Sequence, residues 1–264
     1  MKKAIISFAL FLFFISLIFS TTIIEQADEL FNSRNTPLEN GKPNIENINK
    51  AIELYKQALN NKENTDKDVI IYKLTKAIDF KYFILENNYP KNEKKKIYSN
   101  LIKIIKNELK TRPDSKYLNY SISLAYGRYA TLIGVFTAAR KGMAGKIKKH
   151  TLKLYELDKH FEHCFAPMMM GRIHFKTPKI PLILNWPSNN KSKKYLEEAL
   201  KNCNDYYYIH FFLADTLYKL GYKDRAIKYY KKVLDFKVRE DNRFEDLSLK
   251  KECKERLKEL KINI

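Results

Sequence analysis

Apolar residues recur along most of this chain at spacings that place them on one face of a helix. Four short stretches share one pattern, with apolar side chains at positions i, i+1, i+4 and i+5. This spacing follows the period of an α-helix and departs from the alternation of a half-buried strand. The four stretches are LYKQAL (54–59), IIKNEL (104–109), YLEEAL (195–200) and YYKKVL (229–234). The pattern predicts an all-α protein.

The last two stretches begin 34 residues apart. That distance is the period of the tetratricopeptide repeat, a helix pair that buries its apolar face only against neighbouring pairs. Residues 207–234 fit one such unit without a gap. Small Ala214 is expected where the two helices cross, Ala226 follows twelve residues later as its partner, and Gly221 is expected to end the first helix. We therefore predict a tetratricopeptide-like α-solenoid.

The remaining sequence divides into helix pairs in a looser register. We predict a single helical domain over residues 21–264, with about five antiparallel helix pairs and a C-terminal capping helix. Residues 32–44 lengthen the turn of the first pair. Outside the ungapped unit, the first three expected pairs are 23–31 with 47–59, 68–86 with 93–113, and 115–140 with 145–158. The fourth pair joins a helix that begins at about residue 160 to a helix that contains residues 195–200, and residues 248–260 form the cap.

A proline-rich insert interrupts the fourth pair. Gly171 is the small residue expected on its first helix and Ser192 the partner on its second, and this spacing of 21 exceeds the expected twelve by nine. Residues 178–187 are therefore an insertion, which contains Trp186, the only tryptophan. Prolines hold such a segment extended, so its apolar side chains either pack back onto the solenoid or form an exposed apolar surface. These side chains include Ile180, Leu182 and Leu184.

Residues 1–20 have the layout of a secretory signal peptide. MKK is followed by an apolar run at 4–19 and then by small residues. We expect cleavage after Ser20 and a periplasmic or otherwise exported protein. The second choice is an uncleaved N-terminal membrane anchor. The apolar run is short for this role, because a membrane-spanning helix takes about 20 residues. No cysteine follows the run, which excludes a lipid-modified N-terminal cysteine.

The chain is strongly basic, with 50 Lys and Arg against 30 Asp and Glu and a formal charge of +20. Such a balance raises nucleic acid as a partner. The lysines, however, recur at nearly every exposed helical position instead of clustering with arginine, and an exported protein does not meet nucleic acid. We favour solvated helix faces and predict no nucleic-acid partner.

Three cysteines, Cys164, Cys203 and Cys253, are widely spaced. An exported chain could oxidise one pair of them, and the sequence does not say which. Three buried thiols are the alternative.

Three segments together resemble the T-component proteins associated with TRAP transporters. They are ISLAYGRYATLIG (122–134), residues 155–200 with the proline-containing insert, and HFFLADTLYKLGYKDRAIKYYKKVL (210–234). The resemblance runs from about Ile23 to Leu260. It departs from the family at WPSNN (186–190), where members carry a pair of glycines, and in the absence of a lipid-acceptor cysteine.

This resemblance implies a periplasmic helical solenoid around an internal cavity or pore. It also implies association with a periplasmic solute-binding protein in the uptake of organic acids or apolar ligands, and possible self-association into a homo-oligomer. It carries over no catalytic residue.

The sequence contains no HExxH, GxSxG, phosphate-binding glycine loop or CxxC pair. We therefore predict no enzyme and no cofactor. The nearest candidate metal site comprises His160, His163, Cys164 and His174, whose imidazole and thiolate groups would suit zinc or copper. We favour solvated histidines and a core cysteine over this site.

Arg128 and Arg172 each follow a glycine within a mostly apolar helix. An arginine at the wall of a cavity can bind a carboxylate with two parallel hydrogen bonds. The alternative for both is an ion pair with a neighbouring Glu or a hydrogen bond to helix carbonyls at a cap. The aromatic side chains that would line such a cavity, or that simply belong to the core, are Tyr126, Tyr129, Phe136, Phe175 and Trp186.

Three functions follow in order of preference. The first is an exported accessory protein that binds a small organic acid or apolar ligand, a periplasmic solute-binding protein of a TRAP-type transporter, or both. The second is a protein-interaction adaptor of the cell envelope that grips a peptide or helix in a concave groove. The third is a metal-assisted enzyme.

Overall fold

The computed structural model describes residues 22–61, 66–85, 89–179 and 184–263. Within these ranges the regular structure is helical, and β structure is limited to isolated bridge residues, among them the pair Pro37 and Pro43. The all-α prediction is confirmed. The expected signal peptide at 1–20, as well as Ile180 and Leu182 of the insert, lie outside the described residues. None of the described helices is both long and apolar enough to cross a membrane.

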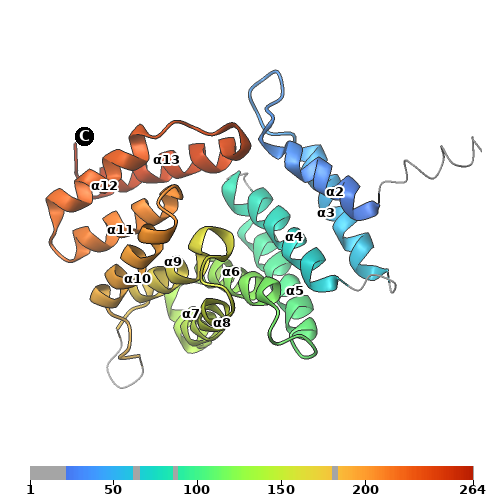
Figure 1. Cartoon of the computed structure of the whole chain (residues 1–264), viewed down its shortest axis with the longest axis horizontal. Helices are drawn as coiled ribbons and strands as arrows, with labels where there is room; N and C mark the ends of the chain where they lie inside the picture. Colours follow the sequence, from blue (N-terminus) through green and yellow to red (C-terminus); the bar gives the residue numbers. More distant parts are fainter. Residues whose placement is uncertain (1–21, 62–65, 86–88, 180–183, 264) are drawn as a thin grey trace, which may run out of the picture.

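The helices pack as five successive antiparallel pairs followed by one terminal helix, as predicted (Figure 1). The pairs are α2 (Ile23–Asn32) with α3 (Ile45–Asn60), α4 (Lys67–Asp79) with α5 (Lys91–Glu108), α6 (Lys116–Ile133) with α8 (Met143–Leu157), α9 (Phe161–Lys176) with α10 (Asn189–Asn202), and α11 (Tyr207–Lys219) with α12 (Lys223–Asp235), before α13 (Arg243–Glu259). Short segments between them are η1 (Ser33–Asn35), a π-helical turn η2 (Phe80–Ile84), α7 (Val135–Arg140) and η3 (Glu240–Asn242).

Local sequence signals explain where several helices begin and end. Thr22 and Glu25 form a capping box at the start of α2, in which each side chain accepts a hydrogen bond from the other residue's backbone N–H. Asn44 and Ser115 cap α3 and α6 in the simpler way, through one side-chain oxygen. Gly221 has φ +88° just beyond α11, which confirms the predicted left-handed end of that helix.

Small residues stand where the paired helices meet. Ala214 and Ala226 are fully buried in the pair α11/α12, as the repeat register predicts. At Gly171, a Cβ atom would lie only 2.5 Å from Cγ of Leu196. The close neighbour of Gly171 is thus Leu196, one helical turn after the predicted Ser192. Ser192 is fully buried too, and its Oγ lies 2.9 Å from Oγ1 of Thr216 in the next pair.

Two predicted helices are interrupted. The helix expected over 115–140 breaks at Gly134, whose φ of +82° an L-residue rarely adopts, and continues as the separate α7. Near its start, α9 contains three successive left-handed residues, Glu162, His163 and Cys164, with φ of 48°, 53° and 60°. Pro167 follows in the first right-handed turn, where its missing N–H has no helical acceptor to lose.

Two apolar cores meet at α9. Met170 belongs to the core that begins at Ala27 in α2, and Met168 belongs to the core that reaches Leu257 in α13. Consecutive helical residues point in different directions, so this methionine segment contributes to both cores at once. Methionine suits this position because its flexible thioether fills irregular gaps.

We expect Gly171→Ala to destabilise the protein, because the added methyl group has no room beside the fully buried Leu196. The loss in free energy of unfolding should be about 1–3 kcal/mol, measured by urea denaturation. Gly127→Ala in α6 is the matched control, since its Cβ would meet only Cε of Met169 at 3.7 Å. The control should gain roughly 0.5–1 kcal/mol from helix propensity. Equal effects at the two positions would contradict the close packing at Gly171.

Candidate functional site

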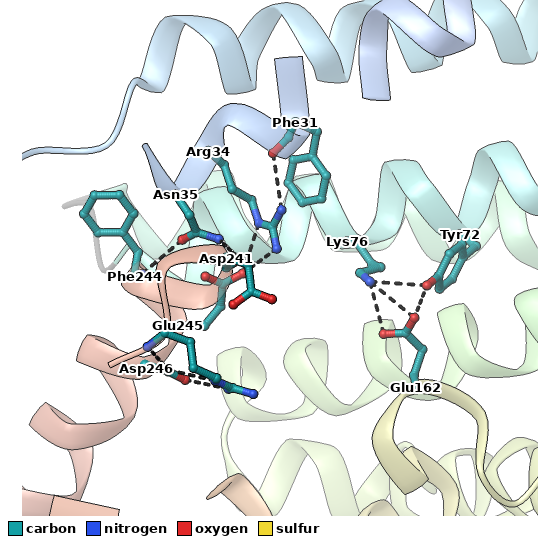
Figure 2. Close-up of polar contacts among 11 residues, drawn as sticks. Phe31, Arg34, Asn35, Tyr72, Lys76, Glu162, Asp241, Phe244, Glu245 and Asp246 are labelled. Carbon is teal, nitrogen blue, oxygen red and sulfur yellow. Dashed lines mark hydrogen bonds and ion pairs between the residues drawn. The ribbon is translucent and has the colours of Figure 1, made fainter. Parts of the chain in front are cut away.

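The two ends of the solenoid are joined by a polar contact that we call the seam, formed by Arg34 and Asn35 of η1 with Asp241, Phe244 and Glu245 (Figure 2). The Asn35 side chain donates from Nδ2 to the carbonyl oxygen of Asp241 at 2.5 Å and accepts from the backbone N–H of Phe244 at 3.0 Å. Arg34 Nε donates to Glu245 Oε1 at 3.0 Å. The seam connects residues more than two hundred positions apart and turns the helix array into a closed arc (Figure 1).

Residues around the seam hold its two halves in place. The Arg34 guanidinium lies 4.5 Å from the Phe31 ring centroid and 5.5 Å from that of Phe80, which links it to the N-terminal core. On the other half, Asp246 accepts hydrogen bonds from the backbone N–H and the guanidinium of Arg239, at 2.7–3.0 Å. The chain therefore enters α13 in a fixed direction, and Asn35 between the two halves is only 5% exposed.

A second contact crosses the arc between α4 and α9 (Figure 2). Lys76 Nζ lies 3.1 Å from Glu162 Oε2, and the Tyr72 hydroxyl donates to the same carboxylate. The three left-handed residues of α9 are thus each anchored by a side chain. Glu162 is anchored by α4, His163 stacks on Tyr206 with ring centroids 4.8 Å apart, and Cys164 forms a disulfide with Cys203. Such a backbone costs about 1–2 kcal/mol per residue and persists because these anchors fix it.

The disulfide answers the question of the three cysteines. Cys164 pairs with Cys203, while Cys253 is a free and fully buried thiol. The disulfide ties the start of α9 to the end of α10 across 39 residues. Cys164 therefore has no thiolate to offer a metal ion. In the described part of the chain, no three His, Cys, Asp or Glu side chains converge as metal ligands.

Arg128, a predicted ligand residue, is paired with an acidic side chain. Its Nε and Nη2 donate to the two carboxylate oxygens of Asp79 at 2.7 and 2.9 Å, and its guanidinium lies 4.5 Å from the Phe83 ring centroid. The Tyr98 hydroxyl also donates to Asp79, at 3.0 Å. Burial, together with the Asp79 charge, raises the pKa of this hydroxyl.

Arg172 has a similar partner in Asp215, with Nη1 2.9 Å from Oδ2. Arg256 Nε and the Tyr230 hydroxyl donate to the other oxygen of Asp215, at 2.8 and 2.9 Å. Burial acts to raise the pKa of Asp215, but the two arginines outweigh it and the pKa is lowered. Arg172, Asp215 and Arg256 border a pocket of about 140 Å³, whose walls are mostly charged. Its lining residues are Arg172, Lys176, Phe211, Asp215, Glu252, Glu255, Arg256 and Glu259.

The predicted aromatic residues lie in separate places. Phe175 is beside Arg172, with 5.3 Å from the guanidinium to the ring centroid. Tyr126 lies 6.2 Å from the His150 ring, and Tyr129 faces Lys141. Trp186 packs back on the solenoid at 5.1 Å from His174. In contrast, Phe136 is 93% exposed and lines no cavity wall. Their predicted ligand-binding role stays a prediction.

The structure also reveals an aromatic row that the sequence analysis missed, formed by Tyr206, Tyr208 and Phe212. Neighbouring ring centroids in this row are 5.5 and 6.0 Å apart, and all three side chains are half-buried. Arg172 lies over the last ring, 4.2 Å from its centroid. Burial, and then the neighbouring Tyr206, raise the pKa of the Tyr208 hydroxyl. The row therefore lies next to the ion-paired arginine of α9.

Comparisons with known proteins agree with this architecture. A tetratricopeptide-repeat family model matches residues 207–237, the unit that contains most of the aromatic row. The crystal structure of a thermophilic tetratricopeptide-repeat protein from Thermus thermophilus superposes with a TM-score of 0.54 at 17% identity. The match covers 81% of this chain and 92% of the other. No curated protein matches by sequence. The fold is thus a tetratricopeptide-type solenoid, and the finer assignment to TRAP T-components stays a prediction.

We expect Asn35→Ala to open the seam without unfolding the helix pairs. The substitution removes two hydrogen bonds, which together contribute about 2 kcal/mol. Amide hydrogen exchange over residues 240–249 should therefore accelerate roughly 10–30-fold. Asn40→Ala in the same linker is the control, because Asn40 is exposed and bonds only to Lys42 nearby. Unchanged exchange in Asn35→Ala would show that the seam does not hold the two ends.

The position of Trp186 should depend on the protonation of His174. The backbone N–H of Ser188 donates to His174 Nδ1 at 3.2 Å, which requires an unprotonated nitrogen. Burial, and then the charges of Lys191 and Lys148, lower the pKa of His174 to about 4. Trp186 fluorescence should therefore change with a midpoint near pH 4. Because the folded pKa lies below the unfolded value of about 6.5, stability should fall as the pH drops from 6.5 to 4.

His174→Asn is the control for this titration, since its side-chain oxygen can still accept from Ser188. This variant should show no fluorescence transition near pH 4. A transition of the same size in both proteins would assign it to another group.

Proposed function

We propose that this chain is a non-catalytic protein-interaction scaffold that holds a segment of a partner protein against the aromatic row. The observation that carries the proposal is the arrangement of Tyr206, Tyr208 and Phe212 beside Arg172 in a tetratricopeptide-type arc. Proteins of this fold generally bind other proteins on extended concave surfaces, and the proposal assigns the row to that surface.

The chemistry of the row suits a binding surface. Aromatic side chains and arginine dominate the few residues that contribute most to protein interfaces, because they bury a large area at a small entropic cost. The three rings of the row are half-buried and keep surface that a partner can cover. The Arg172 side chain is only 16% exposed and is fixed by Asp215, so the row is ordered before any partner binds.

The cell envelope is the proposed location. Residues 1–20 have the pattern of a signal peptide, and the disulfide between Cys164 and Cys203 is typical of an oxidising compartment. Within the envelope, the resemblance to T-component proteins makes a solute-binding protein the first candidate partner. An acidic ligand at Arg128 or Arg172 would have to compete with Asp79 or Asp215.

A photo-reactive amino acid at position 208 should crosslink the full chain to a partner in the native cell envelope. Position 222 is the control, because Tyr222 is 48% exposed and lies in the turn between α11 and α12, away from the row. Mass spectrometry of the adduct then identifies the partner. A TRAP solute-binding protein in the adduct would support the finer assignment, and another protein would support the adaptor function alone.

The double variant Tyr208→Ala, Phe212→Ala should weaken binding of the purified partner by at least about tenfold, because each ring contributes roughly 1–2 kcal/mol at an interface. Tyr222→Ala should leave the Kd unchanged. Calorimetry measures both, and thermal unfolding shows whether each variant is folded. A folded double variant with the wild-type Kd, or equal crosslinking at 208 and 222, would refute the row as the binding surface.

A further inference from the structure

The most exposed apolar side chains in the described part of the chain lie next to one another on α7. Phe136 is 93% exposed and Val135 is 59% exposed. No residue of α7 is buried, although the helix packs against α6 and α8. Two glycines with positive φ, Gly134 and Gly142, bracket the helix and let the chain leave the regular repeat and return to it. Burial of Phe136 within this molecule therefore does not explain its presence.

The charge around α7 has one sign. No Asp or Glu occurs between residues 115 and 155, a stretch that contains eight Lys and Arg. Four of these are exposed beside Phe136 in sequence: Arg140, Lys141, Lys146 and Lys149. Within the described ranges, no ion pair joins any of these four to an acidic side chain, whereas Lys116, Arg128 and Lys153 each have an acidic partner.

The spacing places an aromatic and a basic residue on one face of α7, and two lysines on one face of the adjacent α8. Phe136 and Arg140 are four residues apart and share a face of α7, and Lys146 and Lys149 are three apart and share a face of α8. The two helices lie side by side at the lower edge of the arc, opposite the seam (Figure 1). Exposed aromatic residues surrounded by lysines that lack acidic partners are typical of surfaces that enter the interface of an anionic membrane.

We propose that α7 and the start of α8 dock the protein on the surface of an anionic phospholipid membrane. Phe136 and Val135 enter the headgroup region, and Arg140, Lys141, Lys146 and Lys149 bind the lipid phosphates. The aromatic ring gives the attachment depth, and the basic side chains give the preference for anionic lipid. Docking at this edge leaves the seam, on the opposite side, away from the membrane.

A single reporter placed at position 136 tests the proposal in the full chain. Phe136→Cys creates the only exposed thiol, because Cys164 and Cys203 are joined and Cys253 is buried, with the pKa of its thiol raised to about 12. An environment-sensitive fluorophore on this thiol reports on α7 alone, whatever residues 1–20 do at the membrane. Phe136 is almost wholly exposed, so the substitution should leave thermal unfolding unchanged.

The labelled protein is titrated with vesicles of phosphatidylcholine alone and of phosphatidylcholine with one third phosphatidylglycerol. The emission should shift to the blue with the anionic vesicles, and partitioning onto them should be at least about tenfold stronger than onto the neutral ones. Lys146→Gln with Lys149→Gln in the labelled protein should weaken this partitioning several-fold. Leu247→Cys is the matched control, since Leu247 is an exposed apolar residue of α13 beside Glu245 and Asp246, and its label should not shift.

Three outcomes would overturn the proposal. The first is the absence of a shift at position 136 with anionic vesicles. The second is equal partitioning onto neutral vesicles, which would remove the role of the basic side chains. The third is a shift at position 136 that requires an envelope protein and not lipid, which would make α7 a protein-docking surface.

Discussion

The geometry of this molecule depends on the side chain of Asn35. One amide group bonds to a carbonyl oxygen and to an N–H of the distant segment 241–244, and it does so almost out of contact with solvent. Backbone groups of this kind are costly to leave unpaired when buried. The seam therefore forms only if the helix pairs between α2 and α13 curve by an amount that lets the two ends meet.

The sequence predicts the pairs but not the closure, and the reason is physical. Apolar spacing and the small residues Ala214 and Ala226 describe contacts between neighbours, which the chain repeats at a regular interval. The seam is a single polar contact between residues about two hundred positions apart, and its asparagine lies in a linker with no distinctive pattern. Gly171 shows the same limit at short range. The sequence predicts that a small residue at position 171 lets another helix approach closely. Only the structure shows that the side chain in contact there is Leu196.

The site is only partly predictable for a related reason. Arg128 and Arg172 were singled out because each follows a glycine in an apolar helix. The structure pairs each with an aspartate more than forty positions away, whereas the sequence suggested a neighbouring Glu. The aromatic row had one signal in the sequence, the consecutive tyrosines 206–208. In an amphipathic helix, such aromatic residues are normally interpreted as part of the hydrophobic core. Whether such residues are fully buried or keep exposed surface depends on how α11 packs against α9, α10 and α12.

A closed arc also constrains how the protein can change over evolutionary time. An open array of repeats gains or loses a unit at either end with little consequence, because each unit contacts only its neighbours. Here an added or deleted helix pair would carry Asn35 away from residues 241–244, and both ends would lose their partners together. Lengthening is tolerable only within the connections, and the long linker 32–44 and the insert 178–187 are both found there. The closed shape of the arc thus fixes the number of helix pairs that the chain can contain.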